Sequence, residues 1–303
     1  MQETPKIIVF GKNGFLGSYL FRFFQNQENS YFVYKSNEKT LVVLHRDQPT
    51  VELLWSHEAL LSIVHELQPD VIINAIALIS SEKCEANPLL AEQANAEIPA
   101  VLATAASHVG ARIVQISTDA VFGQPGSNFT EDDDPHPISI YGKTKLQGER
   151  AVAELAPKHL ILRTNFYGHH QSKPTLFDYF YKNLLSEGSV QGYEDVVFNP
   201  VYVKDLVSGI QKFIEVEVQG ILHFVGDEVL SKFDFGNKIS LQMGYRNGRL
   251  SPQNFGDLES VGPRKLDLTL SSRARKSIYQ SIFDIDSGIG DAILNAKVEK
   301  SEL

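Results

Sequence analysis

The sequence predicts an α/β protein built on a doubly wound parallel sheet of about seven strands, with a smaller lobe toward the C-terminus. Short, continuously apolar segments alternate with segments of helical spacing, which is typical of strands buried on both faces of a parallel sheet. The first apolar segment runs into a glycine-rich turn, and the alternation stops after Gly168. A chain of 303 residues can form one large core and a smaller lobe.

The first apolar segment, residues 7–10, is followed by the sequence GKNGFLG at 11–17 and by amphipathic residues to about Phe24. We therefore expect a strand, a glycine turn and a helix. Glycines at such a turn let the backbone bend tightly and let a pyrophosphate approach the helix N-terminus. A glycine triplet alone is a weak motif, and its place after the first buried strand is what favours a dinucleotide site.

A polar, asparagine-rich stretch comes next, and we interpret residues 27–39 as an insertion before the second strand at 41–44. That strand ends in His45-Arg46-Asp47, where a dinucleotide fold reads the adenosine ribose. Arg46 favours a 2'-phosphate and hence NADP(H), whereas Asp47 leaves NAD(H) open. A solvated arginine–aspartate pair at a strand end explains the same residues equally well.

Later segments continue the alternation. Residues 69–77 form an apolar strand ending in small residues, against which a cofactor can lie, and the strand at 111–116 ends in Ser117-Thr118-Asp119. Ligands gather at the carboxyl ends of parallel strands, so Thr118 is a candidate to hydrogen-bond a substrate oxygen, with capping of the local turn as the alternative. The other expected strands are 51–54, 159–163 and 220–225, with a short segment at 196–198, and the expected helices are 57–67, 88–109, 175–185, 203–214 and 231–243.

Tyr141 and Lys145 stand four residues apart at the start of another helical segment, so both side chains lie on one helix face. A cation beside a phenol favours the phenolate and lowers the pKa from its reference value near ~10, which makes the tyrosine a suitable proton donor. Tyrosine and lysine at this spacing also occur by chance on solvated helices. The pair indicates a catalytic site only in combination with Thr118 and the glycine turn.

Composition narrows the classes of function. A formal net charge of -9 argues against a broad surface for nucleic acid or anionic membranes, and the single cysteine, Cys84, allows no internal disulfide and fits a reducing compartment. No segment approaches the roughly 20 apolar residues of a membrane helix. We therefore expect a cytoplasmic protein. The acidic run at 131–134 indicates a solvated loop, and the adjacent His169 and His170 indicate surface or pocket-rim side chains, so we expect no metal site.

Six longer motifs follow one another in a constant order. They are the glycine turn at 11–17, PDVIINAIA at 69–77, ISTDAVFG at 116–123, YGKTKLQGE at 141–149, LILRTNFYG at 160–168 and NPVYVKDL at 199–206. Together they resemble the extended short-chain dehydrogenases/reductases, and most closely the dTDP-4-dehydrorhamnose reductase (RmlD-like) group. A weaker match, PRKLDLTLSS at 263–272, resembles the sugar-nucleotide segment of that group.

The resemblance implies a Rossmann-type NAD(P)-binding domain over residues 1–165, with a returning strand near 220–225, and a mainly substrate-binding lobe over 166–303. NADP(H) is the preferred cofactor and NAD(H) stays open. The implied cofactor-binding residues are Gly11, Asn13, Gly14, Phe15, Leu16, Gly17, Arg46, Asn74, Ala75, Ala77 and Lys145.

The same resemblance implies a catalytic set of Thr118, Tyr141 and Lys145. Thr118 would polarise a ketone, Tyr141 would donate the proton, and Lys145 would depress the pKa of that tyrosine while holding the nicotinamide ribose. Charge developing on the carbonyl oxygen would meet two hydroxyl donors. The implied substrate-binding residues are Asp119, Val121, Phe122, Asn165 and Arg264.

The implied activity is NAD(P)H-dependent reduction of the 4-keto group of a nucleotide-activated 6-deoxy sugar, most closely dTDP-4-dehydrorhamnose to dTDP-L-rhamnose, with a homodimer left open. One alternative is a nucleotide-sugar epimerase or dehydratase, but Ala120 follows Asp119 where dehydration needs a second acid. Another is a non-catalytic regulatory subunit like that of methionine adenosyltransferase. Departures from the group's pattern at 78–85 and 164–166 leave the sugar undetermined.

Overall fold

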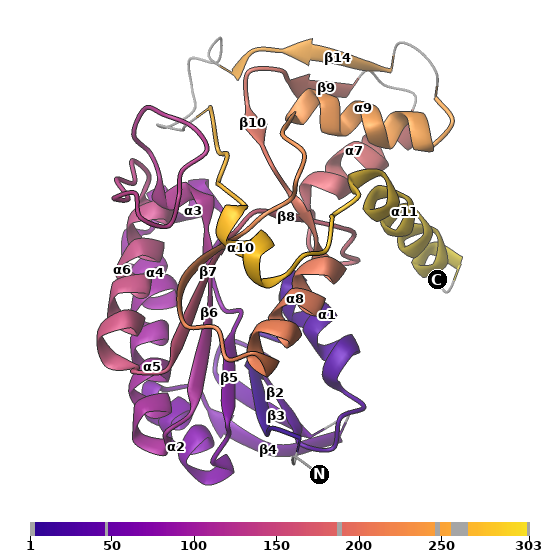
Figure 1. The fold of residues 1–303 in the computed structure, drawn as a ribbon. Coiled ribbons are helices and arrows are strands. Elements are labelled where there is room, and N and C mark those ends of the chain that lie inside the picture. The colour runs from indigo at the N-terminus through magenta and orange to yellow at the C-terminus, as the bar shows by residue number, and fades with distance from the viewer. Residues whose placement is uncertain (1–3, 46–47, 187–189, 246–248, 256–265, 302–303) are drawn as a thin grey trace. The chain divides into compact units, whose positions relative to one another are not determined.

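The computed structural model describes residues 4–45, 48–186, 190–245, 249–255 and 266–301 (Figure 1). Contacts within the chain divide it into two compact units. The first unit comprises Met1–Val121, Pro137–Arg163 and Ile210–Leu222. The second unit comprises Phe122–His136, Thr164–Gly209 and His223–Leu303.

The main sheet has eight strands, in the order β12-β7-β6-β5-β1-β2-β3-β4 (Figure 1). The central strand β1 pairs in parallel with β2 and β5, and β5 pairs in parallel with β6. The expected α/β class with a Rossmann-type sheet is confirmed. The strands are β1 (Ile7–Phe10), β2 (Ser30–Lys35), β3 (Thr40–His45), β4 (Gln48–Leu54), β5 (Val71–Asn74), β6 (Arg112–Thr118), β7 (His159–Thr164) and β12 (Gly220–Phe224).

The expected insertion at 27–39 is wrong, because β2 lies within this range and is a strand inside the sheet. Phe32 and Val33 are buried there and pair with Val9 and Phe10. The segment at 41–44, expected to be the second parallel strand, is β3 and runs antiparallel to β2. Only four residues join β2 to β3, and a link of that length makes a hairpin, since a parallel crossover needs about a dozen residues.

The antiparallel direction of β3 changes where its C-terminal end lies. From the sequence, the residues at that end are expected to contact the adenosine ribose of the cofactor. His45 at the end of β3 pairs with Tyr31, near the start of β2. The end of β3 therefore lies at the edge of the sheet opposite the glycine turn, and the carboxyl end of β2 takes its place beside that turn. Arg46 and Asp47 themselves lie outside the described residues.

Helices of the first unit are α1 (Phe15–Phe24), α2 (His57–Leu67), α3 (Ser81–Ala86), α4 (Pro88–Glu92), α5 (Ile98–Val109) and α6 (Ile140–Leu155). Apolar residues of α2 and α5, such as Leu60 and Leu102, pack with strand residues such as Ile8 and Ile72 into a buried core. The single helix expected over 88–109 is interrupted by a π-helical turn at Gln93–Glu97. That turn brings Asn95 inward, where it is fully buried.

The second unit holds three two-stranded sheets, β10-β13, β11-β8 and β14-β9. Their strands are β8 (Phe166–Tyr167), β9 (Val190–Tyr193), β10 (Val197–Phe198), β11 (Val201–Tyr202), β13 (Leu230–Ser231) and β14 (Leu250–Gln253). Its helices are α7 (Leu176–Leu185), α9 (Lys232–Gln242), α10 (Arg273–Ile278) and α11 (Ile285–Ser301), while α8 (Val203–Glu215) and β12 contribute residues to both units.

Aromatic packing fills the interior of the second unit. Phe235 of α9 meets Tyr167, Phe180 and Phe198 edge-on, at ring-centroid distances of 5.1, 6.3 and 5.7 Å. The absence of a side chain at Gly236 lets α9 approach Phe180 of α7, because a Cβ there would lie 2.6 Å from the ring. Within the described ranges, none of the helices has the length and apolarity needed to span a bilayer.

Candidate active site

The glycine turn joins β1 to α1 by close backbone contacts. Gly11 has a φ of +96°, and a Cβ on it would lie 2.9 Å from the carbonyl carbon of Ala75. A Cβ on Gly17 would lie 2.0 Å from the carbonyl oxygen of Gly11. The turn is thus pressed against both its own helix and the segment after β5, and larger residues do not fit.

The N-terminus of α1 is open to a ligand. Its N-cap, Gly14, has no side chain, and no side chain caps the first turn. The backbone N–H groups and helix dipole at such an end favour an anion. The predicted residues Asn13, Phe15 and Leu16 belong to this turn and to the start of α1, with Leu16 buried beneath it.

Hydrogen bonds inside the protein fix the segment after β5, which lies beside the glycine turn. Asn74 is fully buried, donates from Nδ2 to Gln115 Oε1 at 2.8 Å, and accepts from the Ile76 N–H at 3.1 Å. Its carboxamide is therefore engaged inside the protein, and it shapes the segment containing Ala75 and Ala77. Their contact with a cofactor stays a prediction.

The structure brings the three predicted catalytic residues together in the first unit. Thr118 ends β6, and the first turn of α6 lies directly over the turn that follows it. Gly142 makes this approach possible, because a Cβ there would lie 2.2 Å from the Ala120 carbonyl oxygen. Tyr141 consequently lies close enough to Thr118 for the threonine hydroxyl to lower the pKa of the phenol.

Thr118 is held by its own neighbours as well. Its hydroxyl donates to Asp119 Oδ1 at 2.9 Å and accepts from the Ala120 N–H at 3.2 Å. Because a hydroxyl has one proton, the proton that points at Asp119 must turn toward a substrate oxygen before Thr118 can polarise it. Asp119, predicted to bind substrate, is thus a direct neighbour of the reacting group.

Lys145 lies deeper than expected. It is 3% exposed, and its Nζ donates to the Ile116 carbonyl oxygen of β6 at 2.6 Å. Burial lowers the pKa of Lys145 to about 8, against the raising effect of the Glu149 carboxylate. Its ammonium is therefore fixed to the strand that carries Thr118.

The expectation that Lys145 depresses the pKa of Tyr141 is not met. Burial raises the pKa of Tyr141 above its ordinary value, and the Asp119 and Cys84 charges raise it further, while the hydrogen bond with Thr118 lowers it. Tyr141 is accordingly a phenol at neutral pH and carries the proton it would donate.

Beneath Lys145, a buried cluster joins α6 to two strands. Glu149 is 2% exposed and accepts from Arg163 Nη2 of β7 at 2.8 Å and from Nε at 3.2 Å. The Ser117 hydroxyl of β6 also donates to this carboxylate. Glu149 stands one turn after Lys145, so it fixes α6 against β6 and β7 and keeps a negative charge near the ammonium.

Two further residues position the catalytic helix. Asn95 in the π-helical turn donates from Nδ2 to the Leu78 carbonyl and to Thr144 Oγ1, both at 3.1 Å, and accepts from the Leu78 N–H. Glu85 of α3 accepts from the Ile140 N–H at 2.8 Å. Both tie α6 to the segment after β5.

Sequence reasoning missed Asn95, Glu85, Glu149 and Arg163. Each acts through a partner far along the chain, and the one local signal was the place of Glu149 four residues after Lys145.

The other predicted substrate residues have varied surroundings. Val121 is fully buried in the first unit. In the second unit, Phe122 stacks on Phe129 at 4.6 Å, and Asn165 accepts from the Val201 N–H at 2.9 Å through its backbone. Arg264 lies outside the described residues. Their role in substrate binding stays a prediction.

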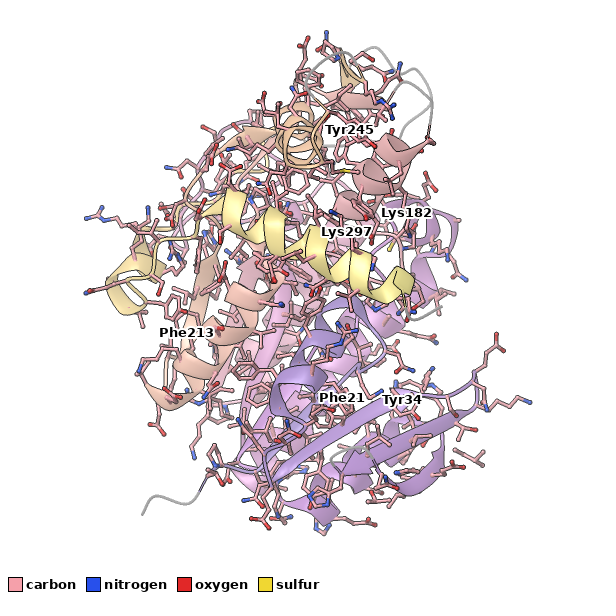
Figure 2. All side chains as sticks on the ribbon, turned by 90° about the vertical axis from the view of Figure 1, so that its right-hand side faces the viewer. Phe21, Tyr34, Lys182, Phe213, Tyr245 and Lys297 are labelled. Carbon is pink, nitrogen blue, oxygen red and sulfur yellow. The ribbon has the colours of Figure 1, made fainter. Side chains whose placement is uncertain are left out.

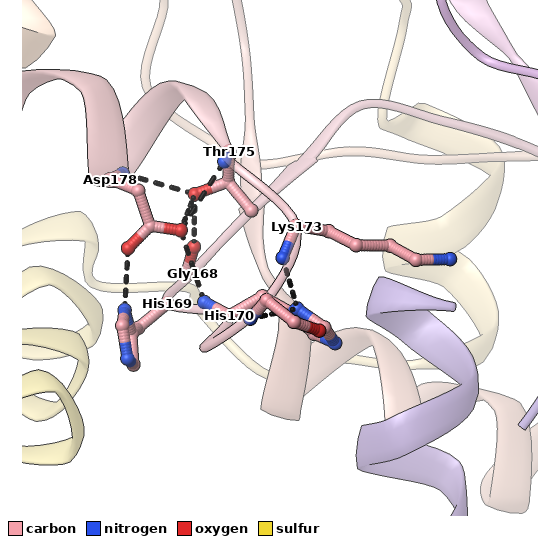
Figure 3. A network of polar contacts seen from close by, with 7 residues as sticks. Gly168, His169, His170, Lys173, Thr175 and Asp178 are labelled. Atoms are coloured by element: carbon pink, nitrogen blue, oxygen red, sulfur yellow. Dashed lines mark hydrogen bonds and ion pairs between the residues drawn. The ribbon is translucent and has the colours of Figure 1, made fainter. Parts of the chain in front are cut away.

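The histidine pair has a structural explanation (Figure 3). His169 is buried, which corrects the expected surface position, and its Nδ1 bonds Asp178 Oδ1 at 2.5 Å. His170 accepts from the Lys173 N–H at 2.9 Å. Asp178 and Thr175 form a capping box at the start of α7. Among the described residues, no group of three or more His, Cys, Asp or Glu side chains has a geometry suited to a metal.

Comparison with known proteins agrees with this geometry. The family model described as the RmlD substrate binding domain matches residues 5–282. The dTDP-4-dehydrorhamnose reductase of Mycolicibacterium smegmatis is 31% identical over 228 residues, which cover 74% of this chain and 70% of the reductase. The β subunit of methionine adenosyltransferase 2 from Mus musculus is 29% identical over 262 residues, covering 82% and 75%.

Among solved structures, the dTDP-4-dehydrorhamnose reductase of Bacillus anthracis in complex with NADP superposes with a TM-score of 0.84. It is 25% identical and covers 97% of this chain and 100% of that chain. A Rossmann-type sheet with threonine, tyrosine and lysine at its carboxyl edge defines an extended short-chain dehydrogenase/reductase, a class of NAD(P)-dependent oxidoreductases. Within this class, the chain belongs to the RmlD family of sugar-nucleotide reductases, which confirms the resemblance.

Proposed function

We propose that this protein reduces the 4-keto group of a nucleotide-activated 6-deoxy sugar, most closely dTDP-4-dehydrorhamnose to dTDP-L-rhamnose, with NADPH or NADH as reductant. The observation that carries the proposal is the close approach of α6 to the end of β6, which brings Tyr141 next to Thr118, while the buried Lys145 bonds the Ile116 carbonyl. A proton donor and a second hydroxyl near the carboxyl edge of β6 support the proposal, because ligands of such sheets gather at that edge.

The residues beside this site fit a dinucleotide. Gly11 and Gly17 leave no room for a Cβ, and the first turn of α1 has no side-chain cap. These features suit a pyrophosphate at the helix N-terminus, with Ala75 and Ala77 forming the wall. When bound, a reduced nicotinamide supplies a hydride to the keto carbon of the sugar.

Residues of this chain donate the proton that the reduction needs. Tyr141 donates its hydroxyl proton to the carbonyl oxygen as negative charge develops there, and Thr118 turns its proton from Asp119 to the same oxygen. The ammonium of Lys145 adds a positive charge near this strand end, and solvent returns a proton to the tyrosinate that remains. Lys145 keeps its own place through the Ile116 carbonyl.

Purified protein with NADPH or NADH and a panel of dTDP-, UDP- and GDP-linked 4-keto-6-deoxy sugars tests the proposal. We expect loss of cofactor absorbance with at least one ketosugar and an equal amount of the 4-hydroxy product by NMR. Conversion of the sugar without net oxidation of the cofactor would instead identify an epimerase or dehydratase.

A second candidate rests on the similarity to the mouse methionine adenosyltransferase subunit, namely a regulatory role without turnover. Silence across the ketosugar panel, together with a stable complex with a methionine adenosyltransferase on size-exclusion chromatography, would favour that role and reject the reductase. We also propose a cytoplasmic location, because the one cysteine fits a reducing compartment.

A further inference from the structure

The end of β2 lies beside the glycine turn. The N–H groups of Gly11 and Lys12 both donate to the carbonyl of Val33, at 2.9 and 3.2 Å. The next residues, Tyr34 and Lys35, therefore stand at the carboxyl edge of the sheet next to the proposed pyrophosphate site. In dinucleotide folds a side chain near this place distinguishes a ribose 2'-hydroxyl from a 2'-phosphate.

Lys12 presents a cation on one face of this strand end. Its Nζ lies 4.4 Å from the ring centroid of Phe21 on α1 and 5.1 Å from that of Tyr34 on β2. Figure 2 shows these two aromatic residues close together on α1 and β2. Burial lowers the pKa of Lys12, and its ammonium has no carboxylate partner in the described part of the chain.

Lys35 presents a second cation on the other face, because successive strand residues point to opposite sides. Its Nζ lies 3.7 Å from the ring centroid of Trp55. Trp55 is fixed at this edge by its N–H, which donates to the Lys39 carbonyl at 2.8 Å. Burial lowers the pKa of Lys35, and the Glu38 carboxylate, which acts at longer range, raises it. Over the described ranges, Lys35 forms no ion pair within 4.0 Å, and both ammonium groups make close contacts with aromatic rings.

We propose that Lys12 and Lys35 bind the 2'-phosphate of NADP(H) and make this enzyme prefer it to NAD(H). A phosphate dianion gains two charge-assisted contacts without breaking an existing ion pair. The last residue of β2 and the residue after it are Lys35 and Ser36, and Glu38, the first carboxylate after the strand, comes three residues after Lys35. This inference rests on the proposed function and names the side chains that choose its cofactor.

Direct binding measures the effect without turnover. Dissociation constants for NADPH and NADH are determined by calorimetry, and quenching of Trp55, the only tryptophan, gives a second readout at the site itself. The fragments 2',5'-ADP and ADP isolate the 2'-phosphate. Lys12→Gln and Lys35→Gln remove one charge each, Lys35→Arg retains it, and Lys39→Gln removes a nearby exposed charge that contacts neither ring.

We expect the unsubstituted protein to bind NADPH at least about tenfold more tightly than NADH, and each lysine-to-glutamine variant to lose about tenfold for NADPH only. Lys35→Arg and Lys39→Gln should retain the preference. Equal affinity for the two cofactors, or equal losses for both, overturns this inference and leaves the reductase intact. Binding of neither cofactor by the folded protein overturns the inference and the reductase together.

Discussion

Two lysines at the carboxyl edge of one sheet are held in opposite ways. Lys145 is buried, bonded to a main-chain carbonyl, and one turn from a carboxylate that Arg163 and Ser117 hold in place. Lys35 is exposed and rests against the ring of Trp55. The first arrangement fixes a cation beside the reacting atoms, and the second leaves a cation free to meet a phosphate.

This difference predicts which substitutions should reduce stability and turnover and which should change cofactor choice. On α6, a side chain contributes both to folding and to the geometry of Thr118 and Tyr141, so stability and turnover should change together. At the end of β2, Lys35 is exposed, although the Trp55 ring beside it packs against the hydrophobic core, so loss of the Lys35 charge should alter cofactor choice with little effect on stability.

Tyr141→Phe should have the largest effect on turnover. It removes the proton donor and leaves the ring, so we expect a loss of about 1,000-fold in kcat with little change in cofactor affinity. Steady-state kinetics and calorimetry check the two quantities. Tyr179→Phe, an exposed tyrosine on α7, serves as the control and should retain full activity. Comparable activity in the two variants would contradict the assigned role of Tyr141.

Glu149→Gln tests the coupling of stability and chemistry on α6. Arg163 would keep its buried charge without a charged partner, which costs roughly 3 to 5 kcal/mol in the free energy of unfolding. Loss of the carboxylate also lowers the pKa of Lys145 further, so the alkaline limb of the kcat profile should move to lower pH.

Denaturant unfolding and a pH–rate profile measure both effects. Glu154→Gln, on the exposed side of the same helix, is the matched control and should change neither. A destabilised Glu149→Gln with an unmoved pH profile would leave Glu149 with a purely structural role.

Lys145→Met tests how the buried ammonium makes stability depend on pH. The pKa of Lys145 is about 8 in the folded protein and 10.5 as the ordinary value, so between these pH values the unfolded chain holds the proton that the folded protein has lost. Stability from this group therefore rises with pH across that window, by up to about 3 kcal/mol.

The free energy of unfolding from pH 7 to 10 should consequently rise less steeply in Lys145→Met than in the parent. This rise in the free energy of unfolding ends near pH 10. Tyr141, whose pKa is raised, stays protonated in the folded protein above that pH, while the same residue ionises in the unfolded chain. Lys143→Met, exposed on the same helix, should follow the parent. Identical slopes for Lys145→Met and the parent would show that burial does not shift this pKa.

Trp55→Phe should have the smallest effect. A smaller ring still attracts the Lys35 ammonium, so NADPH affinity should fall by about two- to fivefold and NADH affinity should stay constant. Calorimetry measures this change, since the variant lacks the fluorescent reporter. An equal loss for NADH would assign Trp55 to the adenine or to folding and not to the lysine.

The same two regions show what the sequence could predict. The places of Thr118, Tyr141 and Lys145 in the fold were predictable because each follows from a local pattern, a strand end or a helical spacing of four, and their catalytic roles stay a prediction. β2 was not, because its tyrosines, serine and lysine lie among polar residues and imitate an insertion. The short link between β2 and β3 was the available signal, since it excludes a parallel crossover.

The orientation of Lys145 was beyond sequence reasoning for a different reason. Its partner is the carbonyl of Ile116, and main-chain acceptors carry no residue-specific signal. The same holds for the bonds of Asn95 to the Leu78 backbone. The residue types indicated which residues lie close together. The backbone geometry determined which atoms form the hydrogen bonds.

The π-helical turn at Gln93–Glu97 has a consequence for how this chain tolerates deletions. A π turn is an α-helix with one residue inserted, and that residue sets the direction in which Asn95 points. Removing one residue there would rotate the preceding helical turn by about 100° relative to α5 and withdraw the amide from Thr144. A gap of a single residue, harmless in a surface loop, would at this place disconnect α6 from the segment after β5.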